Sequence, residues 1–305
     1  MKSRGTHQSL PATAMSTTRR TLLAGGAACL AMSGRTRAAT TRVATVDWAV
    51  LETLLTLGIT PVAATELLQF REVAVEPKVP ESVADLGLRG SINFEMLRLS
   101  RPDLIYSSSF YSGSEPRMRS IARVESFGIY LRNTPPYAGA EAMTRRVGSD
   151  LGIADAASAY IRETEAEFAA LRARLSTRLP VLPMNLVDAK HFRVFGFDSM
   201  FGEALVKLGL PSAWPKEMGA AAMAPIGIET LALIPDAWFA LIPPTPPDAL
   251  RKLCRGALWN ALPNVKAGRL LTLEPVNPYG GLPAARRFAR LLTQALLSSP
   301  GAARG

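Results

Sequence analysis

Cysteine and histidine are scarce in this chain of 305 residues, which contains two of each. Cys29 and His7 lie close to the N-terminus, so only Cys254 and His191 are left for the body of the chain. One cysteine cannot form an internal disulfide, and one histidine cannot provide a cluster of histidine ligands for a metal. A Ser-His-Asp hydrolase triad in the body of the chain would have to use His191.

Long apolar runs and common catalytic motifs are also missing. Outside residues 22–32, no stretch approaches the ~20 apolar residues that a membrane-spanning helix needs. The sequence has no Gly-x-Ser-x-Gly elbow, no phosphate-binding loop and no dinucleotide-binding fingerprint. The sequence therefore gives no support to a membrane-spanning protein or to the enzyme classes that use these motifs.

The N-terminus has the pattern of a bacterial export signal. Arg19 and Arg20 directly precede an apolar run of about 11 residues, 22–32, which is too short to span a membrane. Small residues at Thr36 and Ala38 form a suitable cleavage pair. We therefore predict that residues 1–38 are a twin-arginine signal peptide and that the protein works in the periplasm.

Three alternatives are open for this segment. It could be a basic disordered tail, and the true start could be Met15. Cys29 could carry a lipoprotein anchor, although Gly26 stands where that signal prefers a branched aliphatic residue. Residues 1–38 hold six Lys or Arg residues and no acid, so without them the net charge falls from +10 to +4. With no basic stripe among aromatics left, we expect no nucleic-acid partner.

The body of the chain alternates short β-like runs with helical patterns, which is typical of an α/β fold. Predicted strands occupy residues 43–46, 103–106, 126–131, 181–187, 192–195, 237–242 and 270–273. Predicted helices occupy residues 48–57, 94–99, 199–208 and 282–297. Asp47 and Asn93 are placed to cap the first two helices, and Gly58 follows the first one, where a positive φ is favoured.

A longer helix is predicted in the middle of the chain, over residues 155–178, which contain no Gly or Pro. Its glutamates lie early and its arginines lie late, an order that complements the helix dipole. At 1.5 Å per residue the helix is on the order of 35 Å long, enough to run beside two lobes. The alternative is an ordinary surface helix of one domain.

Several segments of the chain, taken in order, carry a family resemblance. They are residues 83–87 (VADLG), 92–97 (INFEML), 99–105 (LSRPDLI) and 257–269 (ALWNALPNVKAGR). Together they resemble the periplasmic substrate-binding proteins of iron-siderophore and vitamin B12 uptake systems. Residues 86–89, 194–201, 210–214 and 276–280 are most similar to the ferric-hydroxamate (ferrichrome-type) members.

The resemblance implies two Rossmann-like α/β lobes joined by one long α-helix, with the ligand in a cleft between them. The implied boundaries are an N-terminal lobe over residues 39–152, a linking helix over 153–178 and a C-terminal lobe over 179–305. The implied protein is a monomer and not an enzyme, and it has no cofactor. It captures a ferric hydroxamate siderophore, which itself holds the iron, and delivers the complex to an inner-membrane ABC permease with its ATPase.

The resemblance also implies ligand-binding residues. Arg89 is the first of them, since its guanidinium can donate several hydrogen bonds to the hydroxamate oxygens in a fixed fork. Tyr106 ends the strand predicted at 103–106 and Tyr111 lies beyond it, where a cleft loop should begin, and Phe110 competes with Tyr111 for the position facing the ligand. Tyr279 lies in the matched loop near the C-terminus.

The sequence departs from the ferrichrome-type pattern at two aromatic positions. Asn277 stands in place of one pocket tryptophan and is itself expected to contact the ligand, and the loop at residues 218–225 lacks another tryptophan. Met218 and Met223 of that loop could pack adaptably against a bulkier hydroxamate. Acidic residues for docking the permease are expected at Glu229 and Glu115. The four tryptophans, Trp48, Trp214, Trp238 and Trp259, are expected to be structural.

Other cargoes and one other function class are open. Haem would favour an axial tyrosine such as Tyr106 or Tyr111, and cobalamin would favour an aromatic cleft. Ferric catecholates are strongly anionic and call for several cations, whereas Arg89 is the clear candidate here, which favours a near-neutral complex. Outside the class, the alternative is an exported α/β hydrolase that depends on His191.

Overall fold

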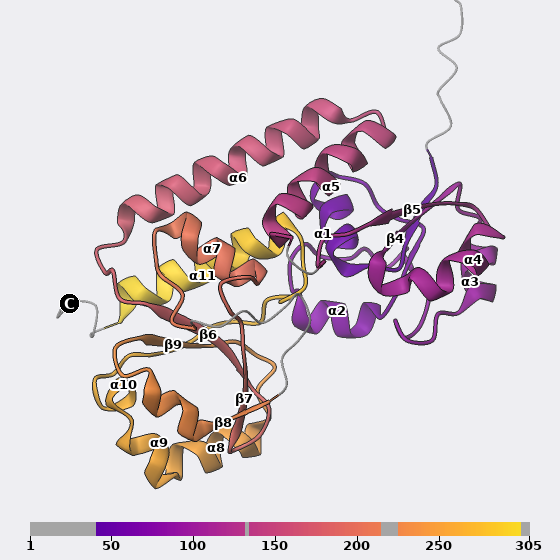
Figure 1. The fold of residues 1–305 in the computed structure, drawn as a ribbon. Coiled ribbons are helices and arrows are strands. Elements are labelled where there is room, and N and C mark those ends of the chain that lie inside the picture. Colours follow the sequence, from indigo (N-terminus) through magenta and orange to yellow (C-terminus); the bar gives the residue numbers. More distant parts are fainter. Residues whose placement is uncertain (1–40, 132–133, 215–224, 300–305) are drawn as a thin grey trace, which may run out of the picture. The chain divides into compact units, whose positions relative to one another are not determined.

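The computed structural model describes residues 41–131, 134–214 and 225–299, which form two α/β lobes (Figure 1). The N-terminal sheet is parallel throughout, in the order β3-β2-β1-β4-β5. Its strands are β1 (Val43–Thr45), β2 (Ala63–Ala64), β3 (Ala84–Asp85), β4 (Leu104–Ser108) and β5 (Arg123–Phe127). The helices of this lobe are α1 (Trp48–Thr56), α2 (Leu67–Val73), α3 (Phe94–Leu99), the 3₁₀ turn η1 (Ser109–Ser114), α4 (Glu115–Arg119) and α5 (Pro136–Asp150).

The C-terminal sheet is mixed, in the order β10-β9-β6-β7-β8. Its strands are β6 (Val181–Leu186), β7 (His191–Val194), β8 (Ile226–Gly227), β9 (Trp238–Leu241) and β10 (Leu270–Thr272), of which β7 runs antiparallel to both neighbours. The helices are α7 (Met200–Leu208), the 3₁₀ turn η2 (Ile228–Leu233), α8 (Pro247–Arg255), α9 (Ala257–Ala261), α10 (Pro263–Lys266) and α11 (Leu282–Ser298).

Local sequence signals explain the helix ends that matter for the site. The Asp47 carboxylate accepts hydrogen bonds from the backbone N–H groups of Ala49 and Val50, 2.8 and 3.2 Å away, and so caps α1 as predicted. Gly58 has the predicted positive φ, +79°, just beyond the end of that helix. Asn93 caps α3 in the same manner.

The linking helix α6 (Ala154–Arg174) is shorter than predicted, because the chain becomes extended at Leu175. Ser176 and Thr177 are weak helix formers and Pro180 follows closely, so the helical pattern is not continued. Its 21 residues span about 30 Å. The helix packs against α5 and α11, one from each lobe (Figure 1).

One buried cluster joins the two lobes. It contains Leu54 of α1, Val147 of α5, Phe168 of α6, Leu205 of α7 and Phe288 of α11. Phe201 and Phe288 stack within it, with ring centroids 4.4 Å apart. A shared core of this kind resists large opening or closing of the lobes, because its side chains would have to separate.

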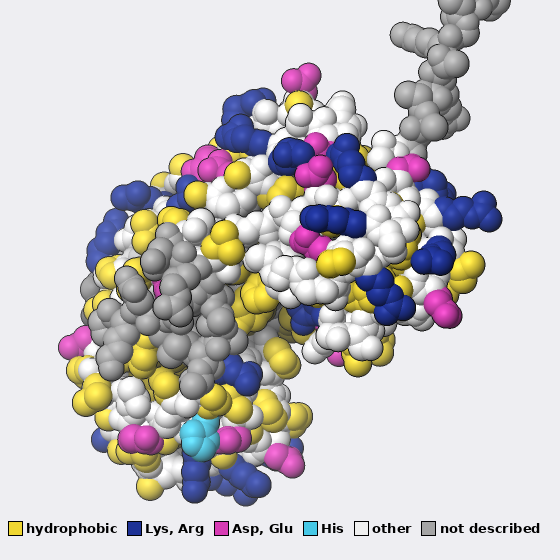
Figure 2. All heavy atoms as spheres, turned by 45° about the vertical axis from the view of Figure 1, so that its right-hand side comes forward, with side chains coloured by type: hydrophobic (Ala, Val, Ile, Leu, Met, Phe, Trp, Pro, Cys, Tyr) yellow, Lys and Arg dark blue, Asp and Glu magenta, His cyan; other side chains and the backbone are white. Residues whose placement is uncertain are grey.

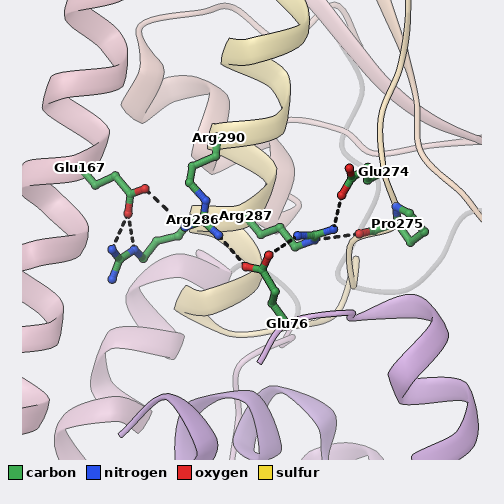
Figure 3. A network of polar contacts seen from close by, with 7 residues as sticks. All are labelled: Glu76, Glu167, Glu274, Pro275, Arg286, Arg287 and Arg290. Carbon is green, nitrogen blue, oxygen red and sulfur yellow. Dashed lines mark hydrogen bonds and ion pairs between the residues drawn. The ribbon is translucent and has the colours of Figure 1, made fainter. Parts of the chain in front are cut away.

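A polar network reinforces this junction (Figure 3). Arg287 of α11 is 5% exposed and binds Glu76 from the loop after α2 at 2.7 Å and Glu274 from the C-terminal lobe at 2.8 Å. Arg286 and Arg290 reach Glu167 of α6 from the same helix. The linking helix, the last helix and a loop of the N-terminal lobe are therefore tied together.

The predicted strand at 126–131 is placed wrongly. β5 covers Arg123–Phe127, and Ile129 fills the core from the turn that follows. β5 is a half-exposed edge strand, so its own residues carry little hydrophobic signal.

The described parts contain no helix suited to span a membrane, and the face drawn in Figure 2 shows no basic stripe. Within the described ranges, no helix combines the length and apolar character needed to cross a membrane. On the face drawn in Figure 2, the Lys and Arg side chains of these residues are interspersed with acidic ones and form no continuous stripe.

Candidate functional site

A cavity of about 630 Å³ lies at the carboxyl edge of the N-terminal sheet. Its walls come from the segments that directly follow β1, β2, β3 and β4, where open parallel sheets place their ligands. The lining residues are Asp47, Trp48, Glu66, Arg89, Gly90, Phe110, Tyr111, Gly113, Ser114 and Tyr279. The last of these comes from the C-terminal lobe, so the cavity lies between the lobes.

Arg89 is held at the wall of this cavity by two contacts. Its guanidinium is ion-paired with Glu66, and its Cζ lies 4.0 Å from the centroid of the Trp48 ring. The turn that carries it requires a positive φ of +74° at Gly87, whose carbonyl accepts from the backbone N–H of Glu66 at 2.8 Å. The arginine and its carboxylate partner are therefore positioned by one local structure.

Phe110 and Tyr111 both line the cavity, so both stay candidates for the position that faces a ligand. Phe110 is 59% exposed, which leaves an apolar ring available for contact. Burial raises the pKa of Tyr111, whereas the nearby positive charge of Arg89 acts in the opposite direction. The hydroxyl is therefore a neutral hydrogen-bonding group beside the guanidinium.

Asp47 adds a carboxylate to the floor of the cavity. Burial raises its pKa, whereas its hydrogen bonds from the N-terminus of α1 and the charge of Arg89 act in the opposite direction. The helix terminus offsets part of its negative charge.

A second cavity of about 290 Å³ adjoins the first and shares Trp48, Arg89 and Tyr279 with it. Its other walls belong mainly to the C-terminal lobe, including Asn185, Arg193 and Phe195 and the turn at residues 242–244. The two cavities thus form one cleft with contributions from both lobes.

Tyr279 is held in the cleft by a buried network behind it. Its backbone N–H donates to Asn277 Oδ1 at 3.1 Å, and Asn277 Nδ2 donates to Glu52 of α1 at 2.8 Å. The Tyr279 ring also meets the Tyr130 ring edge to face, with centroids 5.6 Å apart. Glu52 accepts a second hydrogen bond from the Gly281 N–H, and burial raises its pKa to about 8.

The network changes the role expected for Asn277. Its side chain is 1% exposed and is committed to Glu52 and Tyr279, although the residue borders the second cavity. It therefore positions the tyrosine loop instead of presenting a ligand-facing group.

The prediction for Tyr106 is wrong. Its side chain is completely buried, lines neither cavity and donates to Asp150 at the end of α5, 3.3 Å away. The error arises because β4 continues to Ser108, two residues beyond the predicted end, so Tyr106 lies inside a strand that is buried along its whole length.

The remaining predicted residues lie outside the cleft. Glu229 is exposed at the start of η2, and Glu115 is ion-paired with Arg119 at 2.7 Å. Met223 and Met218 fall outside the described residues.

His191 is exposed and pairs with Asp188, and it lines neither cavity. No cluster of three or more His, Cys, Asp or Glu side chains suited to a metal occurs in the described ranges.

Three residues of the cleft were missed by sequence reasoning. Trp48 was expected to be structural, and it is indeed 4% exposed, yet it forms a wall of both cavities. Glu66 and Arg193 belong to no recognisable sequence motif. Only the folded chain brings them beside Arg89 and Tyr279. Their positions just after β2 and within the antiparallel strand β7 are the signals that could have found them.

Two α/β lobes joined by one long helix, with a cleft at a sheet's carboxyl edge, define a substrate-binding protein. The chain belongs to the periplasmic binding protein family, whose model matches residues 43–276. Members of this family bind and present substrates.

Relatives of known structure or name agree with this assignment. The chain is 30% identical over 257 residues to the iron(3+)-hydroxamate-binding protein FhuD of Escherichia coli K12, covering 84% of this chain and 86% of that protein. The crystal structure of Fe³⁺-Desferal-bound FhuD from Vibrio cholerae matches with a TM-score of 0.82 and 26% identity, covering 86% of this chain and 100% of that one. The petrobactin-binding protein YclQ of Bacillus subtilis matches in fold, with a TM-score of 0.70, 15% identity and coverage of 84% and 91%.

Proposed function

We propose that this protein captures ferric hydroxamate siderophores in the periplasm and delivers them to an inner-membrane ABC permease. The observation that carries this proposal is the guanidinium of Arg89, which faces the cavity beside Tyr111 and over Trp48. Hydroxamate oxygens bound to iron are partly negative acceptors, which a guanidinium fork and a phenol hydroxyl match. The similarity to the two FhuD proteins supports the same cargo.

The apolar part of the cleft suits the organic backbone of such a ligand. Phe110, Trp48 and Tyr279 provide aromatic surface around the polar groups, an arrangement usual in small-molecule sites. The volume of about 630 Å³ lies in the range of such sites. The iron stays with the siderophore, and the protein contributes no iron ligand in this proposal.

The rest of the uptake route is proposed on the same basis. The protein leaves the cytoplasm by the twin-arginine route, acts as a monomer and docks through Glu229, with Glu115 as the candidate on the other lobe. Because Glu115 is engaged by Arg119 and Glu229 is exposed, Glu229 is the stronger docking candidate. Glu229→Arg should lower iron uptake in cells without changing siderophore affinity.

Gel filtration after incubation with a ferric trihydroxamate tests the proposal. We expect one iron per protein to co-elute, and no iron when the same protein is incubated with ferric citrate. Elution of the protein without iron in both cases would contradict a ferric hydroxamate cargo.

A further inference from the structure

The two cavities of the cleft differ in the charge of their walls. The first has two carboxylates, those of Asp47 and Glu66, and the guanidinium of Arg89. The second has two guanidiniums, those of Arg89 and Arg193, and its described lining includes no Asp or Glu. Arg89 is already paired with Glu66, whereas Arg193 has no acidic partner among the residues that the structure describes.

The strand that carries Arg193 turns it toward the cleft. In β7, Phe192 and Val194 are buried in the core of the C-terminal lobe, while Arg193 between them is exposed. Arg193 lies opposite Asn185 in the β6–β7 ladder, and both residues line the second cavity. Among the described residues, its side chain makes no hydrogen bond or ion pair.

Two amides that line the second cavity are already engaged, which leaves Arg193 as a charged donor with no acidic partner among the described residues. Asn185 Nδ2 donates to the carbonyls of Ile242 and Pro244, at 2.9 and 3.0 Å, so its amide hydrogens hold the adjoining turn. Asn277 is committed to Glu52 and Tyr279. A guanidinium without a carboxylate partner, at the wall of a partly apolar cavity, is suited to bind an anionic group in a forked geometry.

We propose that the second cavity is a subsite for a carboxylate carried by the ferric hydroxamate, and that Arg193 binds this carboxylate. The inference rests on the function proposed above and narrows its substrate class. The iron-hydroxamate core lies against Arg89 and Tyr111, and the carboxylate arm passes Trp48 and Tyr279 to reach Arg193. The same charge disfavours a ligand whose arm ends in an ammonium group.

One hydroxamate scaffold with three pendant charges tests this subsite. Desferal ends in a primary amine, which is cationic when free, neutral when acetylated and anionic when succinylated. We would titrate the full chain with the three ferric complexes and follow tryptophan fluorescence. Because a charge-assisted pair adds about tenfold in affinity, the succinylated complex should bind about tenfold more tightly than the acetylated one. The amine should bind most weakly.

Variants of Arg193 test whether this residue causes the preference for the anionic complex. Arg193→Gln should remove the difference between the three complexes, and Arg193→Lys should retain part of it. Arg174→Gln is the matched control, since Arg174 is an exposed arginine at the end of α6 that lines neither cavity. It should leave the preference intact.

Failure of this subsite and failure of the proposed function give different results. Equal binding of the three complexes to the unaltered protein would overturn the subsite and leave the hydroxamate function standing. An equal loss for all three complexes in Arg193→Gln would also overturn it, because the residue would then not read the pendant charge. Binding of none of the three would overturn the proposed function, and the subsite with it.

Discussion

The guanidinium of Arg89 lies over the indole of Trp48, with its Cζ 4.0 Å from the ring centroid, at the wall that both cavities share. The ion pair with Glu66 fixes the same group from the other side. Ring and carboxylate together hold the donor in one orientation, so little conformational entropy is lost when it meets a ligand. Such preorganisation makes Arg89 the residue on which affinity should depend most.

Arg89→Ala should weaken binding of a ferric trihydroxamate by about tenfold to a hundredfold, because hydrogen bonds from a charged donor contribute about 1.5–3 kcal/mol. Isothermal titration measures the change. Arg117→Ala is the matched control, since Arg117 also lies over an aromatic ring, Phe94, with its Cζ 4.1 Å from the centroid, but outside the cleft. Equal effects of the two substitutions would contradict the assignment.

Tyr111→Phe should lower affinity by about twofold to tenfold, since it removes one hydroxyl worth about 0.5–1.5 kcal/mol. Tyr106→Phe is its counterpart, because Tyr106 is fully buried and lines neither cavity. That change should leave affinity unaltered and alter only the free energy of unfolding, through the lost hydrogen bond to Asp150. A binding defect in Tyr106→Phe would show that the two tyrosines are assigned the wrong way round.

Much of the fold could be predicted from local signals. The caps Asp47 and Asn93, the turn glycines and the apolar runs of β1, β4, β6 and β9 mark their elements clearly. Helix α5 was not predicted, because Pro135, Pro136 and Gly139 at its start resemble the composition of a loop. Gly148 of that helix is required by packing, since a Cβ at this position would lie only 2.5 Å from Ala157 Cβ in α6.

The lining of the cleft was predictable where it lies in a matched motif, as at Arg89, Tyr111 and Tyr279. It was not predictable where the lining depends on which way a side chain points. Tyr106 and Tyr111 are five positions apart, yet one lies in the core and the other in the cavity. Arg193 lines the second cavity from an antiparallel strand. It is far from Arg89 in the sequence, so the sequence does not indicate that the two residues share a cavity.

Glu52 should make stability depend on pH. Burial raises its pKa to about 8 in the folded protein, against about 4.3 in an unfolded chain. Between these values the folded protein keeps a proton that the unfolded chain has released. The free energy of unfolding should therefore fall as pH rises from about 5 to about 8, by at most about 1.4 kcal/mol per pH unit.

Glu52→Gln isolates this contribution, because Asp47 and the other buried acids are unchanged. Urea unfolding at pH 5, 6.5 and 8 should show a steeper decline for the unaltered protein than for the variant. Parallel declines would mean that Glu52 does not titrate in this range.

Arg287 should be the most important member of the polar network in Figure 3. Its buried guanidinium binds Glu76, Glu274 and the carbonyl of Pro275, whereas Arg290 is 41% exposed and shares Glu76. Arg287→Met should lower the free energy of unfolding by about 2–3 kcal/mol. Arg290→Met, the control, should cost less than about 1 kcal/mol. Chemical denaturation measures both, and equal losses would contradict a special role for the buried arginine.

In the proposed function the cleft around Arg89 binds a ferric hydroxamate, and Trp48 is a reporter inside that cleft. The most direct measurement is tryptophan fluorescence of the protein titrated in parallel with a ferric trihydroxamate, haem and cobalamin. We predict saturable quenching by the hydroxamate alone, weakened in Arg89→Ala and strongly reduced in amplitude in Trp48→Phe. Saturation by haem or cobalamin with no response to the hydroxamate would contradict the account.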